Sequence, residues 1–113
     1  MSDPTIDVPT FEALQATTGA AFVGELVDTF LAEVPGMLAD LRAALAAGDA
    51  ARFRRAAHSL KSNANTFGAM PFAALARELE LGGLAQADNH ARLDALEQEL
   101  ARVTHRLREL KGA

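Results

Sequence analysis

Apolar residues recur along this chain in steps of three and four, and this spacing constrains the fold more than any other feature. Two long runs show it most clearly. One seam, in residues 20–47, consists of Val23, Val27, Phe30, Val34, Leu38, Leu41 and Leu45, and another, in residues 90–110, consists of Leu93, Leu96, Leu100, Val103, Leu107 and Leu110. Such seams are typical of bundle helices, and with no Trp or Tyr among the residues they predict an all-α protein.

Glycine, proline and capping residues divide the chain into five helices. We predict them at about residues 11–16, 20–47, 50–67, 71–81 and 90–110. Thr10 is expected to cap the first and Asp49 the third, and Asp88 or Asn89 the last. Residues 1–9, which contain two prolines, are predicted to be an N-terminal tail.

Pro35-Gly36 interrupts the second helix, but the apolar seam continues in phase beyond it. We therefore expect a kink in one helix, with a break into two helices as the alternative. Phe22, Leu26 and Leu31 widen the apolar face before the proline, and the short first helix is expected to cover it.

The connections between the long helices are short, as at Gly48-Asp49, so that neighbouring helices are expected to be antiparallel. The predicted fold is an up-down-up-down four-helix bundle with a short additional N-terminal helix. At 113 residues the chain makes one domain, predicted to span residues 10–111. Met1 and the capped beginning suggest a stand-alone protein, expected to be a monomer.

Composition excludes several classes of function. The chain has no cysteine, which excludes disulfides, a thiol nucleophile and a zinc site built on thiolates. Its net charge of −4 argues against nucleic-acid binding. It begins with no basic segment followed by an apolar run and has no apolar stretch of about 20 residues, so we expect a cytoplasmic protein that does not bind membranes. No glycine-rich phosphate loop is present, which argues against nucleotide binding.

One histidine stands out in residues 53–68. The apolar stripe of this helix consists of Phe53, Ala57, Leu60, Ala64 and Phe67. His58 lies about 140° from the centre of that stripe, beside Arg54, Lys61 and Asn65. No acidic residue occurs between Asp49 and Glu78, so the imidazole is expected to lie exposed on a basic surface. The alternative is an ordinary solvated helix face.

This arrangement suits phosphoryl chemistry. A neutral imidazole nitrogen is available near pH 7, and neighbouring cations such as Lys61 can offset the charge on phosphoryl oxygens. A carboxylate on the next helix could accept a hydrogen bond from Nδ1 and leave Nε2 free to react. Glu80 is the candidate, unless it pairs with Arg77 in solvent. His90 and His105 are too dispersed to predict a metal site.

The chain resembles the histidine-containing phosphotransfer (HPt) domain of bacterial multistep phosphorelays. The resemblance rests on His58-Ser-Leu-Lys61-Ser62, Gly68-Ala69, Leu75 and Leu79-Glu80. Ser62 stands where the family usually has glycine, but serine is also small. In length and helix order the resemblance extends over nearly the whole chain.

The resemblance implies a role for each matching position. His58 would carry the phosphoryl group on Nε2, Lys61 would stabilise it and Glu80 would orient the ring. Gly68 would give a partner room to dock. Arg54, Ser62 and Asn65, together with Gly68, are the docking residues expected on this surface.

The implied partners are the receiver domains of a hybrid sensor histidine kinase and of a response regulator. The partner's aspartate pocket would supply Mg²⁺, and the chain itself would need no cofactor and would not autophosphorylate. A helical adaptor that binds receiver-like domains without phosphate chemistry is the alternative. A hydrolase with His58 as general base ranks last, because no credible nucleophile or oxyanion arrangement accompanies it.

Overall fold

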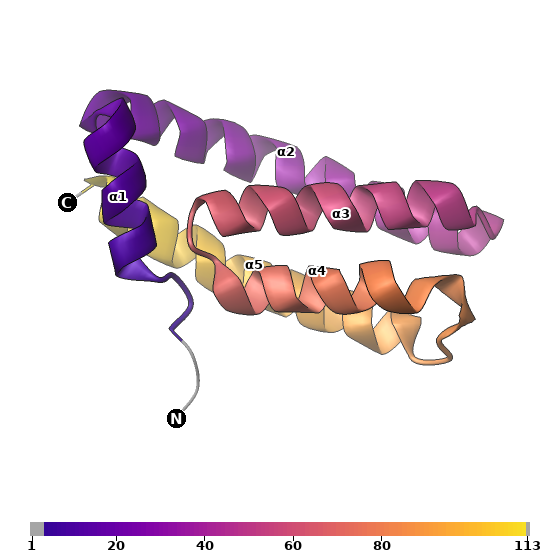
Figure 1. The fold of residues 1–113 in the computed structure, drawn as a ribbon. Coiled ribbons are helices and arrows are strands. Elements are labelled where there is room, and N and C mark those ends of the chain that lie inside the picture. Colours follow the sequence, from indigo (N-terminus) through magenta and orange to yellow (C-terminus); the bar gives the residue numbers. More distant parts are fainter. Residues whose placement is uncertain (1–3, 113) are drawn as a thin grey trace.

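The computed structural model describes residues 4–112, and within this range the regular elements are all helical. They are α1 (Val8–Thr18), α2 (Ala20–Ala47), α3 (Ala50–Thr66), α4 (Met70–Gly82), the 3₁₀ turn η1 (Gly83–Ala85) and α5 (Asn89–Gly112). The predicted all-α class is confirmed. Figure 1 shows α2 to α5 running along the length of the molecule, with α1 crossing one end. The α3–α4 turn lies at the end where α1 crosses, and the α2–α3 and α4–α5 connections lie at the other.

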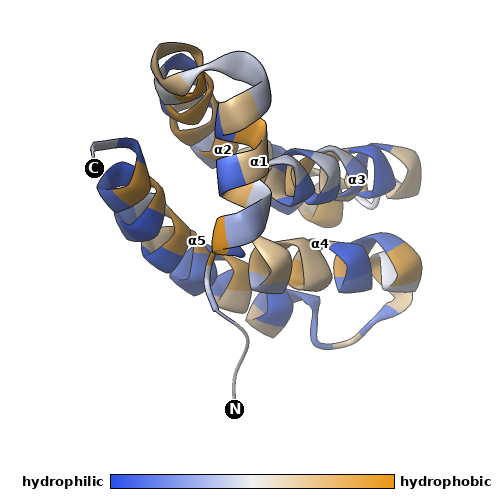
Figure 2. Ribbon diagram, turned by 60° about the vertical axis from the view of Figure 1, so that its left-hand side comes forward, coloured by the Kyte–Doolittle hydropathy of each residue, from blue (hydrophilic) through white to orange (hydrophobic). Residues whose placement is uncertain are grey.

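The predicted seams form the core. α3 packs against α2 and α4, and α5 packs against the same two helices, so that the four long helices enclose one interior. Each buried Leu, Val or Phe side chain stabilises the fold by about 1.5–3 kcal/mol. Figure 2 shows hydrophilic and hydrophobic residues recurring along each long helix, as expected of amphipathic helices. The buried seam residues of α2 and α5 are Val23, Val27, Phe30, Val34, Leu38, Leu41, Leu93, Leu96, Val103 and Leu107.

The predicted boundaries of the long helices are close to those observed. α2 continues through Pro35 as a single helix, which excludes the break into two helices; the kink stays a prediction. Asp49 caps α3 as predicted, because its carboxylate accepts a hydrogen bond from the backbone N–H of Arg52 at 3.1 Å. α5 begins at Asn89, so that Asp88 precedes it. None of the helices in the described range is both long and apolar enough to cross a bilayer.

The prediction for the N-terminal segment is wrong in its boundaries. α1 extends from Val8 to Thr18 rather than over residues 11–16. Its cap is Asp7, not Thr10, because the Asp7 carboxylate accepts from both the backbone N–H and the hydroxyl of Thr10. Proline in the first turn needs no N–H partner there, so the helix can begin before Pro9.

Ile6 is only 1% exposed, so the end of the predicted tail belongs to the core; residues 1–3 lie outside the described residues. The backbone N–H of Asp7 donates to the carbonyl of Gly68 at 2.7 Å, which attaches the segment before α1 to the α3–α4 turn. The predicted cover of the wide α2 face is incomplete. Leu26 and Leu31 pack partly buried against the core, but Phe22 stays 49% exposed.

Candidate functional site

His58 lies on the outer face of α3, and its side chain is 58% exposed. The apolar stripe on the opposite side of α3 faces the core, which directs the imidazole outward. Its Nδ1 lies 2.8 Å from Oε2 of Glu80, on the neighbouring helix α4. The predicted exposure of the ring and its predicted contact with Glu80 are therefore both present.

Glu80 contacts two side chains of α3 at once. Its second oxygen, Oε1, accepts a hydrogen bond from Nζ of Lys61 at 2.6 Å. This bond is the largest reason why the pKa of Glu80 lies below its ordinary value of 4.5; the bond to His58 lowers the pKa further, and partial burial opposes both. The pair with Arg77 that the sequence left open is not formed. In the described part of the chain Glu80 forms an ion pair with Lys61 and a hydrogen bond with His58.

The ionised state of Glu80 determines the tautomer of His58. A carboxylate has no proton to donate, so the imidazole must supply the hydrogen between Nδ1 and Oε2. In the neutral ring the lone pair is then on Nε2. This nitrogen can react with a partner while the other holds the ring in place.

His58 and Lys61 face different hollows of the surface. His58 lines a shallow pocket of about 410 Å³ together with Ala51, Arg54, Arg55, Ser59 and Glu80. Lys61 lines a smaller hollow of about 220 Å³, which it shares with Asn65, Met70, Ala73, Ala74 and Arg77. The predicted cluster of Arg54, Lys61 and Asn65 around the imidazole is thus divided, and Arg54 is the member that shares the pocket of His58.

Sequence reasoning missed Ala51 and Ser59 as neighbours of the imidazole. Helical spacing could have indicated both residues, because Ala51 is seven residues before His58 and Ser59 lies in the same turn as the histidine. Both side chains are short, and both line the pocket beside Arg54.

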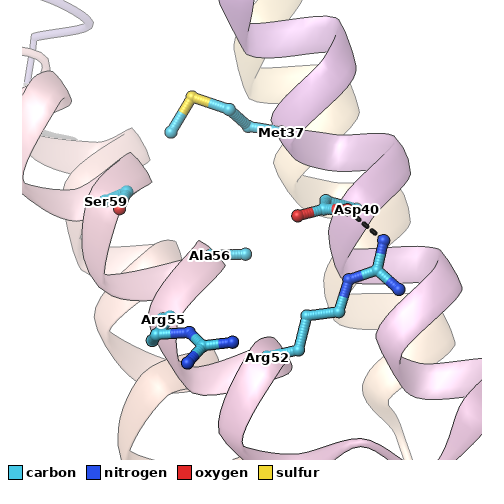
Figure 3. A pocket seen from close by; sticks show the side chains of 6 residues that line it. All are labelled: Met37, Asp40, Arg52, Arg55, Ala56 and Ser59. Atoms are coloured by element: carbon cyan, nitrogen blue, oxygen red, sulfur yellow. Dashed lines mark hydrogen bonds and ion pairs between the residues drawn. The ribbon is translucent and has the colours of Figure 1, made fainter.

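The basic surface around His58 is partly neutralised. Arg52 forms an ion pair with Asp40 of α2, and Lys61 forms an ion pair with Glu80 of α4. Figure 3 shows the Arg52–Asp40 pair at the edge of a second pocket, between α2 and α3, which Arg55 also lines. Arg54, Arg55 and Arg77 form no ion pair with any residue in the range 4–112.

Of the four predicted docking residues, three are exposed and one is buried. Arg54, Ser62 and Asn65 are exposed on α3. Gly68 is buried, and a Cβ added there would lie 2.8 Å from the carbonyl oxygen of Asp7. The prediction that Gly68 gives a partner room to dock therefore needs correction, because the chain's own N-terminal segment occupies that space.

Metal binding finds no support in the described residues. No group of three or more His, Asp and Glu side chains in residues 4–112 is arranged to hold a metal ion. His90 is exposed at the start of α5, and His105 lies 3.8 Å from Glu109 on the same helix. Neither histidine contributes to the site around His58.

Comparison with known proteins agrees with this geometry. The family model described as the Hpt domain matches residues 25–110. No curated protein matches the chain. The crystal structure of histidine-containing phosphotransfer protein B (HptB) from Pseudomonas aeruginosa PAO1 is similar, with 30% sequence identity and a TM-score of 0.90 over 98% of this chain and 97% of that one. The protein therefore belongs to the Hpt domain family of histidine phosphotransfer proteins, the intermediates of two-component phosphorelays.

Proposed function

We propose that His58 accepts a phosphoryl group from the aspartate of a receiver domain in a hybrid sensor histidine kinase and passes it to the aspartate of a response regulator. The observation that supports this most is the geometry of the ring. Nδ1 is held by an ionised carboxylate, and the other nitrogen, Nε2, belongs to a side chain that is 58% exposed. A nucleophile with one fixed nitrogen and one accessible nitrogen can meet two partners in turn on the same surface.

The transfer needs no redox partner and no proton acceptor. The lone pair of Nε2 forms a bond to phosphorus while the P–O bond of the aspartyl phosphate breaks, and its electron pair stays on the partner's carboxylate. The phosphorylated ring keeps its proton on Nδ1 and becomes cationic, which strengthens its hydrogen bond to Glu80. The second transfer reverses these steps on the aspartate of the next receiver.

The other roles follow from this step. Glu80 orients the imidazole, and Lys61, whose ammonium donates a hydrogen bond to Glu80, stabilises the phosphorylated site by holding that carboxylate ionised. Mg²⁺ belongs to the partner's aspartate pocket, and the chain acts as a phosphotransfer intermediate without a cofactor or autokinase activity. Arg54, Ser62 and Asn65 belong to the docking surface. We propose that the protein acts as a cytoplasmic monomer.

The proposed architecture behind this surface is the antiparallel up-down-up-down bundle. The positions of the helix connections in Figure 1 support it. A rigid bundle suits the role because phosphoryl transfer depends mainly on the position of the reacting groups and on charge stabilisation.

Phosphoryl transfer from a purified, phosphorylated receiver domain tests the proposal. The wild-type chain should gain phosphate that is acid-labile and base-stable, as expected for phosphohistidine, and His58→Gln should gain none while its circular dichroism stays helical. His90→Gln and His105→Gln are matched controls and should be labelled as fast as the wild type. Labelling of His58→Gln at the wild-type rate would contradict the proposal. Equal receiver binding by wild type and His58→Ala without transfer would instead favour the adaptor.

A further inference from the structure

We infer that Arg54, with Arg55 beside it, binds the phosphoryl group once it is attached to His58, and that Lys61 acts on the reaction through Glu80. This inference rests on the proposed function and goes beyond it, because it names the cations that contact the phosphoryl oxygens. The cations on α3 lie on two sides of the imidazole, Arg54 and Arg55 on one and Lys61 on the other.

Lys61 contacts Glu80 on the neighbouring helix. Its side chain is 25% exposed and its ammonium lies 2.6 Å from Oε1 of Glu80, whose Oε2 faces Nδ1 of His58. Lys61 therefore lies on the Nδ1 side of the site, and it lines a hollow that His58 does not line. The phosphoryl group belongs on the opposite nitrogen. A residue in this position is a positioning residue, which holds Glu80 ionised and in place.

Arg54 and Arg55 lie one turn before His58 on α3. Side chains of a helix lean toward its N-terminus, so the ring of His58 covers the preceding turn, which carries these two arginines four and three residues earlier. Both line the pocket of about 410 Å³ that contains His58. Arg55 also lines the neighbouring pocket between α2 and α3 (Figure 3), so the two hollows share this side chain.

The guanidinium groups of Arg54 and Arg55 suit the binding of a phosphoryl group. Neither arginine forms an ion pair with another side chain in residues 4–112, so their guanidinium groups can bind an anion without losing an existing partner. A guanidinium group donates two parallel hydrogen bonds to phosphate oxygens, and it stays charged at every physiological pH. Ser59, in the same pocket, can donate a further hydrogen bond.

The phosphoryl group itself is the probe for this arrangement. Phosphoramidate can phosphorylate histidine without a partner protein, as its P–N bond breaks and ammonia leaves. In a background of His90→Gln and His105→Gln, only His58 can take the label. A ³¹P NMR titration then gives the pKa of the phosphoryl group, which a nearby cation lowers because it favours the dianion. The charged groups around it are Arg54, Arg55 and Lys61 on α3 and Glu80 on α4.

Removal of a contacting charge should raise this pKa. A charge about 5 Å away in water shifts a pKa by roughly half a pH unit. Arg54→Gln should therefore raise the phosphoryl pKa by about half a unit, and Arg54→Gln with Arg55→Gln by about one unit. The control Arg77→Gln removes another exposed arginine, which lines the other hollow, and should shift the value by less than about 0.2 units.

The outcomes separate this inference from the proposed function. A shift with Arg54→Gln no larger than with Arg77→Gln would overturn the inference, and so would a larger shift with Lys61→Met than with Arg54→Gln. Both results would leave transfer from a receiver to His58 intact. Failure of the proposed function would appear differently, as phosphoramidate labelling of His58 without any transfer from a phosphorylated receiver.

Discussion

Gly68→Ala tests whether the N-terminal segment is an integral part of this domain. Gly68 has a φ of +79°, a conformation that costs a residue with a Cβ roughly 1–2 kcal/mol. The new Cβ would also lie 2.8 Å from the Asp7 carbonyl oxygen and 3.0 Å from Cβ of Thr10. A backbone atom at that distance cannot rotate away, so the segment before α1 must move.

The structure indicates what this movement costs. It breaks the hydrogen bond from the Asp7 N–H to the Gly68 carbonyl, worth about 1 kcal/mol. It also exposes part of Ile6, whose full burial contributes about 1.5–3 kcal/mol. With the backbone strain, the expected loss in the free energy of unfolding is about 3–5 kcal/mol. That is a large share of the stability of a domain, typically about 5–15 kcal/mol.

Gly48→Ala provides a matched control. Gly48 has a φ of +68°, but a Cβ there would meet no atom within 4 Å, so only the strain of roughly 1–2 kcal/mol is expected. Urea unfolding followed by circular dichroism should show Gly68→Ala about 2 kcal/mol less stable than Gly48→Ala. Equal losses would refute the argument from the N-terminal segment. Normal stability of Gly68→Ala with loss of transfer to His58 would restore the docking role that the sequence predicted.

Three further predictions concern Glu80. Glu80→Ala should slow labelling of His58 and mix the two tautomers of its ring, as seen by ¹⁵N NMR. Glu80→Gln keeps an acceptor for Nδ1–H, so the labelling rate and the single tautomer should be largely restored. Equal effects of the two variants would contradict the orienting role. Lys61→Met should raise the pKa of Glu80, measured by ¹³C NMR, because the bond from Lys61 is the largest cause of its lowered value. The lowered pKa also means that ionised Glu80 stabilises the fold above its ordinary pKa of 4.5, and that this contribution is lost as the pH falls through the folded-state pKa. The difference in the free energy of unfolding between wild type and Glu80→Gln should therefore shrink on acidification.

The sequence was a good guide to the long helices because burial and periodicity agree there. Each residue predicted for the α2 seam is buried or packs against the core. The N-terminal segment failed for a physical reason. From local pattern, a short stretch with two prolines is predicted to be a tail. Its place in the fold depends on a contact with Gly68, which lies about 60 residues further along the chain. Local pattern cannot reveal such a tertiary contact.

In the candidate site, too, some features follow from local sequence pattern and others do not. The exposure of His58 follows from the apolar stripe of its own helix, and the contact with Glu80 follows from packing α3 against α4. The occupation of Gly68 by the chain's own backbone does not follow from any spacing. A small residue indicates close approach, but the sequence does not say whether the approaching group is a partner or another part of the same protein.

In the proposed transfer, the two oxygens of Glu80 determine which cation can bind the phosphoryl group. By helical spacing alone, Arg54 and Lys61 are equivalent neighbours of His58, one turn before it and one turn after it. Glu80 removes this equivalence, because it binds Nδ1 with one oxygen and Lys61 with the other. Phosphorylation of His58, as proposed, would place a cationic ring against Glu80 and an anionic group on Nε2, so that the two new charges would lie on opposite sides of the imidazole. The carboxylate would then face the new positive charge, and Arg54 and Arg55, which have no ion-pair partner in residues 4–112, line the pocket where the negative charge would develop.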